Sequence, residues 1–181
     1  MKENKEKVLL QACCGICSAY PIEHLRELGY EPAAYFFNPN IQPEEEYEKR
    51  LEAQKKLCKD LDCELIVEEY NPKMFEIVSF GLEEEPEGGD RCKKCFELRL
   101  TKTAEKAKEL GIKHFTTSIV ISPHKNHELI SKLGKEISQK YEVDYLGIDF
   151  KKKDGFLKSN KKAKELDLYR QNYCGCLYSK N

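Results

Sequence analysis

The sequence predicts an α/β fold in which a five-stranded, mainly parallel sheet carries helices on both faces. Short apolar runs alternate with longer segments of helical periodicity, the order expected of successive β-α-β units. The 181 residues show neither an internal repeat nor a linker, so residues 1–181 are expected to form a single domain. In such sheets ligands bind beyond the carboxyl ends of the strands. Residues that directly follow a predicted strand are therefore candidates for a functional site.

The first half of the chain is expected to supply three of the five strands. Residues 8–12 form a short apolar run, which predicts a buried strand. Ser18 has the side chain of an N-cap for the following helix, and Gly29 is expected to end that helix. The next elements are expected at residues 32–37 (strand), 44–61 (helix) and 63–70 (strand).

The second half opens with residues 75–89, a poorly periodic and acidic stretch. A long helix should follow, ended by Gly111. The expected elements are residues 92–110 (helix), 114–121 (strand), 128–141 (helix), 143–148 (strand) and a partly helical tail from residue 155. The tail carries Cys174 and Cys176.

Seven of the nine cysteines fall into three tight clusters. The clusters are Cys13, Cys14 and Cys17 after the first strand, Cys92 and Cys95 at the start of the long helix, and Cys174 with Cys176 in the tail. Thiolates grouped from separate segments hold iron–sulfur clusters, zinc or a redox disulfide. The remaining two, Cys58 and Cys63, are interpreted as core residues. A metal or redox centre is the leading hypothesis.

Each cluster has its own chemical possibilities. The first lies at a strand-to-helix turn, where backbone N–H groups and the helix dipole favour a thiolate or a sulfide cluster. Cys92 and Cys95 are three residues apart and share one helix face. Asp90 beside them is either a helix cap or an oxygen ligand. Cys174 and Cys176 could cycle as a disulfide, or one could ligate while the other reacts. Two C-x-x-C pairs could instead hold structural zinc, but they lie too far apart for a zinc ribbon.

The charge pattern and the start of the chain give weaker signals. The formal net charge of −1 carries no global nucleic-acid signal. The lysines of residues 151–164 form a local basic segment, which is either a solvated surface or a docking face for a polyanion. Residues 1–7 are charged, and no apolar run approaches the roughly 20 residues of a membrane helix. We therefore expect a cytoplasmic protein without a membrane partner, whose thiols stay reduced.

Five motifs, taken together, resemble the cobalamin-independent epoxyqueuosine reductases. The similarity extends from about residue 7 to residue 179. The motifs are LQACCGICS (residues 10–18), FFNPNIQP (36–43) followed by Glu46 and Tyr47, DRCKKCFELRL (90–100), TTS (116–118) with ISPHK (121–125), and YRQNYCGCLYS (169–179).

The resemblance implies the last step of queuosine synthesis, a two-electron removal of the epoxide oxygen as water from epoxyqueuosine at the wobble position of a tRNA anticodon. It implies a 4Fe–4S cluster, an additional iron and no cobalamin. It also implies a fold related to the PP-loop, adenine-nucleotide alpha hydrolase-like domains. Those relatives hold ATP phosphates in a loop that CCGICS replaces here, so no ATP is expected. The electron donor is expected to be a protein such as a ferredoxin or flavodoxin.

Within this resemblance we assign roles to the clustered cysteines. A 4Fe–4S cluster transfers one electron at a time, so a second centre is chemically useful. We expect Cys13, Cys14, Cys92 and Cys95 to hold the cluster. The second, catalytic element is expected to comprise Cys17, Asp90, Cys174 and Cys176, as an iron acting as Lewis acid or as a redox dithiol. The candidate substrate-binding residues are Asn38, Asn40, Ser118, His124, Lys152 and Arg170.

Two other functions fit some of the same residues. One is an iron–sulfur-dependent sulfur-transfer enzyme for tRNA, against which the missing phosphate loop argues. The other is a zinc module that binds nucleic acid without catalysis.

Overall fold

Five parallel strands form one sheet in the computed structural model, which describes residues 4–179. The strand order is β3-β2-β1-β4-β5, and all four pairings are parallel. The strands are β1 (Glu6–Gln11), β2 (Tyr30–Phe36), β3 (Glu64–Val67), β4 (His114–Thr117) and β5 (Asp144–Tyr145). This order is that of a doubly wound, Rossmann-like sheet, so the expected fold class is confirmed.

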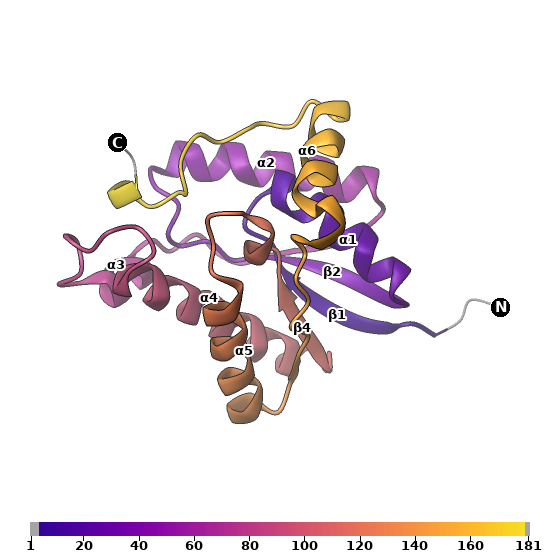
Figure 1. Cartoon of the computed structure of the whole chain (residues 1–181), viewed down its shortest axis with the longest axis horizontal. Coiled ribbons are helices and arrows are strands. Elements are labelled where there is room, and N and C mark those ends of the chain that lie inside the picture. The colour runs from indigo at the N-terminus through magenta and orange to yellow at the C-terminus, as the bar shows by residue number, and fades with distance from the viewer. Residues whose placement is uncertain (1–3, 180–181) are drawn as a thin grey trace.

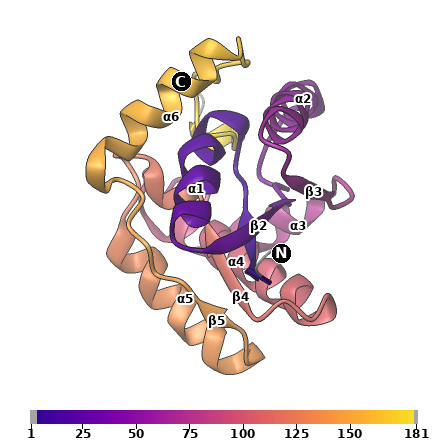
Figure 2. The same ribbon diagram turned by 90° about the vertical axis from the view of Figure 1, so that its right-hand side faces the viewer.

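Helices cover both faces of the sheet (Figures 1 and 2). On one face α1 (Gly15–Glu27) packs against α2 (Glu44–Asp60) and α6 (Gly155–Glu165). On the other, α4 (Asp90–Glu109) packs against α5 (His127–Tyr141), and the short α3 (Lys73–Ser79) lies against α4. Short 3-10 turns complete the fold at Ile119–Ile121, Lys152–Asp154 and Leu177–Ser179. No helix within residues 4–179 is long and apolar enough to cross a membrane.

The central strand β1 joins the loops at the carboxyl edge of the sheet. Val8, Leu9 and Leu10 are fully buried, as expected of a strand covered by helices on both faces. The strand ends with a buried polar residue, Gln11, whose Nε2 donates to the carbonyl of Phe37 at 3.3 Å. Its Oε1 accepts from the Thr117 hydroxyl at 2.9 Å. One amide side chain thus joins the loops that leave β1, β2 and β4.

Several strands are shorter than the sequence predicts. The predicted strand 114–121 ends at Thr117, after which the Ser118 N–H donates to the carbonyl of Gln11 and the chain turns. The apolar run Ile119–Ile121 forms a 3-10 turn instead of a strand. Its side chains are still buried, because they pack in the core next to the carboxyl edge of the sheet. The predicted strands 63–70 and 143–148 shrink to four and two residues, since each is an edge strand that pairs on one side only.

Two predicted helix caps are wrong. Helix α1 begins at Gly15, and Cys14 rather than Ser18 is its N-cap, because the Cys14 Sγ accepts from the Cys17 N–H. Helix α4 begins at Asp90 with Gly89 in the capping position, and no side chain makes a cap hydrogen bond there. Asp90 therefore lies within the first turn, where its negative charge still interacts favourably with the helix dipole.

The tail from residue 155 is helical in part, as expected. Helix α6 ends at Glu165, and the chain then runs irregularly across the end of α1 and along α2 to the 3-10 turn at Leu177–Ser179 (Figure 1). Cys174 and Cys176 lie in this irregular segment, not on a helix. Residues 75–89, expected to be irregular, begin with most of α3.

We predict that the Gly134→Ala substitution in α5 destabilises the protein. Alanine inside a helix normally gains about 1 kcal/mol over glycine. Here, however, a Cβ would lie 2.5 Å from the Tyr145 ring and 2.6 Å from its Cγ, so the ring cannot swing aside. Overpacking costs about 1–3 kcal/mol, and contacts this far below 3.0 Å place the cost in the upper part of that range, about 2–3 kcal/mol. After the helix gain of about 1 kcal/mol, a net loss of roughly 1–2 kcal/mol in urea denaturation of the metal-free protein is expected.

Gly147→Ala is the matched control, since its Cβ would meet its nearest neighbours at 3.7 and 3.8 Å, ordinary contact distances. Its stability should stay within about 0.5 kcal/mol of the wild type. A Gly134→Ala protein as stable as the wild type would contradict the close packing of α5 on β5.

Candidate metal and redox centre

Three thiols gather where β1 passes into α1. The Sγ atoms of Cys13, Cys14 and Cys17 all lie within 4.8 Å of one another. Cys14 has an extended backbone, and its Sγ accepts from the Cys17 N–H at 3.4 Å. Because neighbouring residues of an extended segment point in different directions, Cys14 turns inward while Cys13 faces the carboxyl edge of the sheet. We call these residues the cysteine trio.

The trio is arranged to hold one negative charge, on Cys13. Hydrogen bonding from Cys14, then from Cys17, holds the pKa of Cys13 well below its usual range, and the nearby Arg99 charge assists. The same interaction with Cys13 raises the pKa of Cys14 to about 12. It also raises the pKa of Cys17 well above the usual value. Ser118 adds to this pattern, because its hydroxyl lies 3.4 Å from the Cys13 Sγ and accepts from the Cys13 N–H at 3.1 Å.

The other four clustered cysteines come together on the opposite side of the same edge. Cys92 and Cys95 of α4 and Cys174 and Cys176 of the tail line one enclosed cavity of about 10 Å³, which side chains almost fill. Cys95 and Cys176 also pack against the buried ring of Phe75. Burial raises the pKa of Cys95 to about 11. We call these four residues the cysteine quartet.

Two cations lie between the trio and the quartet. Arg99 is buried on α4, and its guanidinium lies 3.8 Å from the Cys95 Sγ and 3.0 Å from the Asn38 Oδ1. Burial opposes its charge, but Cys95 and Cys13 together raise the pKa of Arg99. Lys125 follows β4, and its Nζ donates to the Cys174 Sγ at 3.2 Å. Burial lowers the pKa of Lys125, but the charge and hydrogen bond of Cys174, together with the charges of Cys92 and Glu87, outweigh it and raise that pKa overall.

The loop after β2 holds the arginine in place. The Asn38 Nδ2 donates to the carbonyl of Ala12 at 2.9 Å, and its Oδ1 accepts from both Arg99 and Gln11. Gln11 belongs to the strand that delivers Cys13. The position of Arg99 is therefore tied to the position of the trio through two amide side chains.

A larger cavity of about 460 Å³ opens beside both groups of cysteines. Cys13, Cys17 and Cys174 reach its wall together with Arg99 and Lys125. The rest of the wall mixes polar and apolar side chains. Its polar residues include Ser122, His124, Asn160, Arg170, Gln171 and Asn172, and Phe156 and Tyr173 are its aromatic residues. This volume lies in the range of small-molecule sites, and it brings a bound molecule against three thiols and two cations.

The structure brings most of the predicted site residues to this edge. All seven clustered cysteines, Asn38, Asn40, Ser118, His124 and Arg170 lie around the two cavities or in the layer behind them. Asp90 and Lys152 differ: both are exposed, and neither lines a cavity among the described residues. Cys58 and Cys63 are buried in the main core, as predicted.

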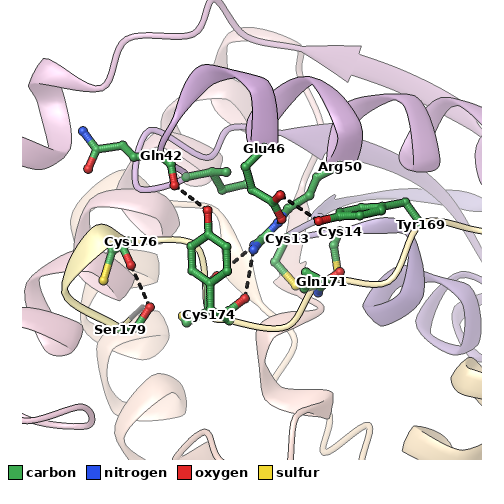
Figure 3. Close-up of polar contacts among 12 residues, drawn as sticks. Cys13, Cys14, Gln42, Glu46, Arg50, Tyr169, Gln171, Cys174, Cys176 and Ser179 are labelled. Carbon is green, nitrogen blue, oxygen red and sulfur yellow. Dashed lines mark hydrogen bonds and ion pairs between the residues drawn. The ribbon is translucent and has the colours of Figure 1, made fainter. Parts of the chain in front are cut away.

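Some functional residues escape the sequence analysis. Arg99, four residues after Cys95, shares a helix face with it, and that spacing could have identified it. Lys125 and Gln171 lie inside motifs but show no spacing that assigns them. The Gln171 Nε2 donates to the Cys14 Sγ at 2.9 Å, so the tail covers the trio (Figure 3).

The donor set fits a cysteine-bound iron–sulfur centre. All nine cysteines are free of disulfides, so seven thiols are available at one edge. Such a centre carries net negative charge, which the buried Arg99 and the partly buried Lys125 balance. Among the described residues, the buried Asn40 Oδ1 and Arg99 Nε atoms beside the quartet lack hydrogen-bond partners, so both atoms are available to a bound group.

Comparison with known proteins identifies close relatives along almost the whole chain. The family model for epoxyqueuosine reductase QueH matches residues 8–181. The QueH protein of Streptococcus pyogenes is 39% identical over 97% of this chain and 71% of its own length. The QueH proteins of Dehalococcoides mccartyi and Thermotoga maritima are 37% and 36% identical, over 92% and 89% of their lengths and 96% and 95% of this chain.

A solved structure supports the fold alone. It is described as a predicted subunit of tRNA methyltransferase from Methanocaldococcus jannaschii, and it superposes with a TM-score of 0.55 at 17% identity. The alignment covers 78% of this chain and 66% of that protein.

We predict that Cys13 is the first thiol of the trio to be alkylated in the metal-free protein. Its lowered pKa keeps it ionised at pH values where an ordinary thiol, and still more Cys14 and Cys17, is protonated. The rate of iodoacetamide labelling at Cys13 should therefore persist as the pH falls through 8, while labelling at the other two rises only at high pH. Peptide mass analysis after timed labelling measures each rate.

Ser118→Ala is the companion variant, because it removes one hydrogen bond to the Cys13 thiolate. It should move the Cys13 rate profile to higher pH. Faster labelling of Cys14 or Cys17 than of Cys13 at pH 8 would contradict the single shared thiolate.

Proposed function

Because this chain belongs to the epoxyqueuosine reductase QueH family, we propose that its seven clustered cysteines form the reducing centre of an epoxyqueuosine reductase acting on tRNA. The observation that carries the proposal is the joint wall of the 460 Å³ cavity, where thiols of the trio and the quartet meet the cations Arg99 and Lys125. The family match and this geometry point to the same chemistry.

The reaction defines what the site has to supply. Both C–O bonds of the epoxide break, a carbon–carbon double bond forms, and the oxygen leaves as water. Two electrons and two protons must therefore reach the substrate. The proposed proton carrier is the Lys125 ammonium, whose Nζ lies 3.2 Å from the Cys174 Sγ.

The electrons are proposed to come through a 4Fe–4S cluster and an additional iron or redox cysteine pair. A cluster of this kind, when bound, supplies electrons singly at a low potential. The chain contributes thiolate ligands, a buried arginine that favours negative charge, and a cover of tail residues that limits access of water. No ATP or cobalamin is needed for this chemistry.

We retain the division of cysteines expected from the sequence. Cys13, Cys14, Cys92 and Cys95 hold the 4Fe–4S cluster, one pair from each side of Arg99. Cys17, Cys174 and Cys176 belong to the second element, and Asp90 would have to move inward to join them. One observation favours another division, in which the quartet holds the cluster: its four thiols line one small cavity.

The substrate is proposed to enter as an unpaired anticodon-loop nucleotide. Single-stranded RNA bases are recognised by stacking on aromatic or arginine planes and by hydrogen bonds to their edges. Phe156, His124 and Arg170 offer such planes on the cavity wall. The exposed lysines around α6, namely Lys152, Lys153, Lys161 and Lys164, lie where phosphates of the flanking RNA would contact the protein. The other candidate substrate-binding residues are Asn38, Asn40 and Ser118. They lie in the layer behind the thiols, so they would act on the substrate indirectly.

The electron donor is proposed to be a small redox protein such as a ferredoxin or flavodoxin, which delivers single electrons. A cytoplasmic location, where tRNA is modified, is consistent with such an electron donor.

The first test is direct turnover. The reconstituted protein, incubated anaerobically with epoxyqueuosine-containing tRNA and a chemical reductant, should convert the modified nucleoside to one that lacks a single oxygen atom. Nucleoside mass analysis of the digested tRNA measures this conversion. A brown preparation containing iron and sulfide that leaves the nucleoside unchanged would refute the reductase function, and a colourless zinc protein would refute the cofactor.

Two alanine variants separate the roles of the cysteines. Cys92→Ala should lose both the visible absorption of the cluster and at least about 100-fold in turnover, because a ligand is removed. Cys174→Ala should keep the iron–sulfur absorption yet lose turnover to a similar extent. Cys58→Ala, in the main core, is the control that keeps both. Loss of the cluster in Cys174→Ala would replace the proposed division with the quartet alternative.

A further inference from the structure

One arginine outside the thiol groups is buried under the tail. Arg50 of α2 is only 2% exposed, and its guanidinium makes three hydrogen bonds at the same distance of 2.9 Å. Nη1 donates to the carbonyl of Cys174 and Nη2 to that of Tyr173. Nε donates to the Glu46 carboxylate, one helical turn earlier. The fork thus holds two consecutive peptide carbonyls of the tail (Figure 3).

Glu46 extends this contact toward the start of the tail. Its side chain is 9% exposed, and its second oxygen accepts from the Tyr169 hydroxyl at 2.7 Å. The carboxylate therefore orients Arg50 and also fixes the tail four residues before Tyr173. We call Glu46 and Arg50 the tail clasp.

The neighbouring loop closes around the same segment. The Gln42 N–H donates to the carbonyl of Gly175 at 2.9 Å, and the Tyr173 hydroxyl donates to the carbonyl of Gln42. Gly175 has φ +131, and a Cβ there would lie 3.0 Å from the Arg50 Nη1. Only glycine lets the backbone of Cys174 and Cys176 approach the guanidinium so closely.

The cost of this arrangement suggests a task beyond stability. An ion pair taken out of water is on average no more stabilising than apolar side chains of the same size. The guanidinium instead provides directional hydrogen bonds, which fix the carbonyls of Tyr173 and Cys174 on the two sides of the Cys174 Cα. On the far side of Cys174, the thiol meets the Lys125 Nζ at 3.2 Å.

We propose that Arg50, oriented by Glu46, is a positioning residue that fixes the Cys174-Gly175-Cys176 segment and so presents the Cys174 thiol to Lys125 and the large cavity. This inference rests on the proposed function, because the position of Cys174 matters only if that thiol takes part in the reduction. Arg50 itself lines the cavity at its outer wall, but its polar contacts are to the tail and to Glu46.

The test uses the burial of Cys176, which is 6% exposed and can be alkylated only when the tail opens. In the metal-free protein, Arg50→Met removes the fork, and Arg50→Lys keeps the charge but cannot hold two carbonyls. Both variants should raise the iodoacetamide labelling rate of Cys176 about tenfold or more. Cys58 and Cys63, buried at 3% and 8% elsewhere, report global opening and should label at the wild-type rate.

The loaded enzyme supplies the second readout. A misplaced Cys174 should lower kcat about tenfold or more while KM for tRNA stays within twofold, because the fork serves the reacting group rather than RNA binding. Arg26→Lys is the matched control, since Arg26 likewise donates to two carbonyls, those of Leu61 and Asp62, but on the far end of α2. It should change neither Cys176 labelling nor kcat.

The outcomes are decisive in either direction. Cys176 labelling within twofold of the wild type, labelling that rises equally at Cys58 and Cys63, or rescue of kcat by Arg50→Lys overturns the positioning role. Where the Arg50 variants do not fold, Glu46→Gln, which removes the negative charge and keeps an acceptor oxygen for only one of its two partners, gives the same reading with a smaller effect. The labelling needs neither metal nor turnover, so a wild type without reductase activity refutes the proposed function and leaves the clasp to be judged on its own.

Discussion

Charge compensation among largely buried groups is the constraint on which the rest of this structure depends. Thiolates and cations are both costly to bury alone, and each lowers the cost of the other at short range. Arg99 is placed where it reaches Cys95 on one side and influences Cys13 on the other. Lys125 lies beside Cys174 in a similar way, with its Nζ 3.2 Å from the Sγ. The charge of Arg99 thus helps to lower the pKa of Cys13 and opposes the effect of burial on the pKa of Cys95.

The sheet and the tail solve different parts of that problem. Parallel strands bring the ends of β1, β2 and β4 to one edge, and the Thr117–Gln11–Asn38 chain of hydrogen bonds links the three. Arg99 of α4 is held at the end of this chain by Asn38. The positions of these side chains follow from the backbone of the sheet. The tail has no such ladder, so side chains must hold it, and Arg50 with Glu46 does so through charge-assisted hydrogen bonds.

Prediction from the sequence succeeds where the information is local. The spacing of Cys13, Cys14 and Cys17 places them at one turn by covalent geometry, and the alternation of strands and helices specifies the α/β class. It fails where tertiary packing decides. Ile119–Ile121 read as a strand because an apolar run does not reveal whether its backbone pairs or turns. Arg50 reads as one more charge on a charged helix, since only the path of the tail makes it buried.

The route of the tail has a consequence for how the protein matures. Gln171 contacts Cys14 across 157 residues of sequence, so the trio is covered by a segment that the ribosome makes long after it. The tail therefore cannot cover the trio until nearly the whole chain has been made. Its docking takes Cys14 out of solvent, whereas Cys13 and Cys17 stay on the wall of the large cavity, within reach of whatever enters it.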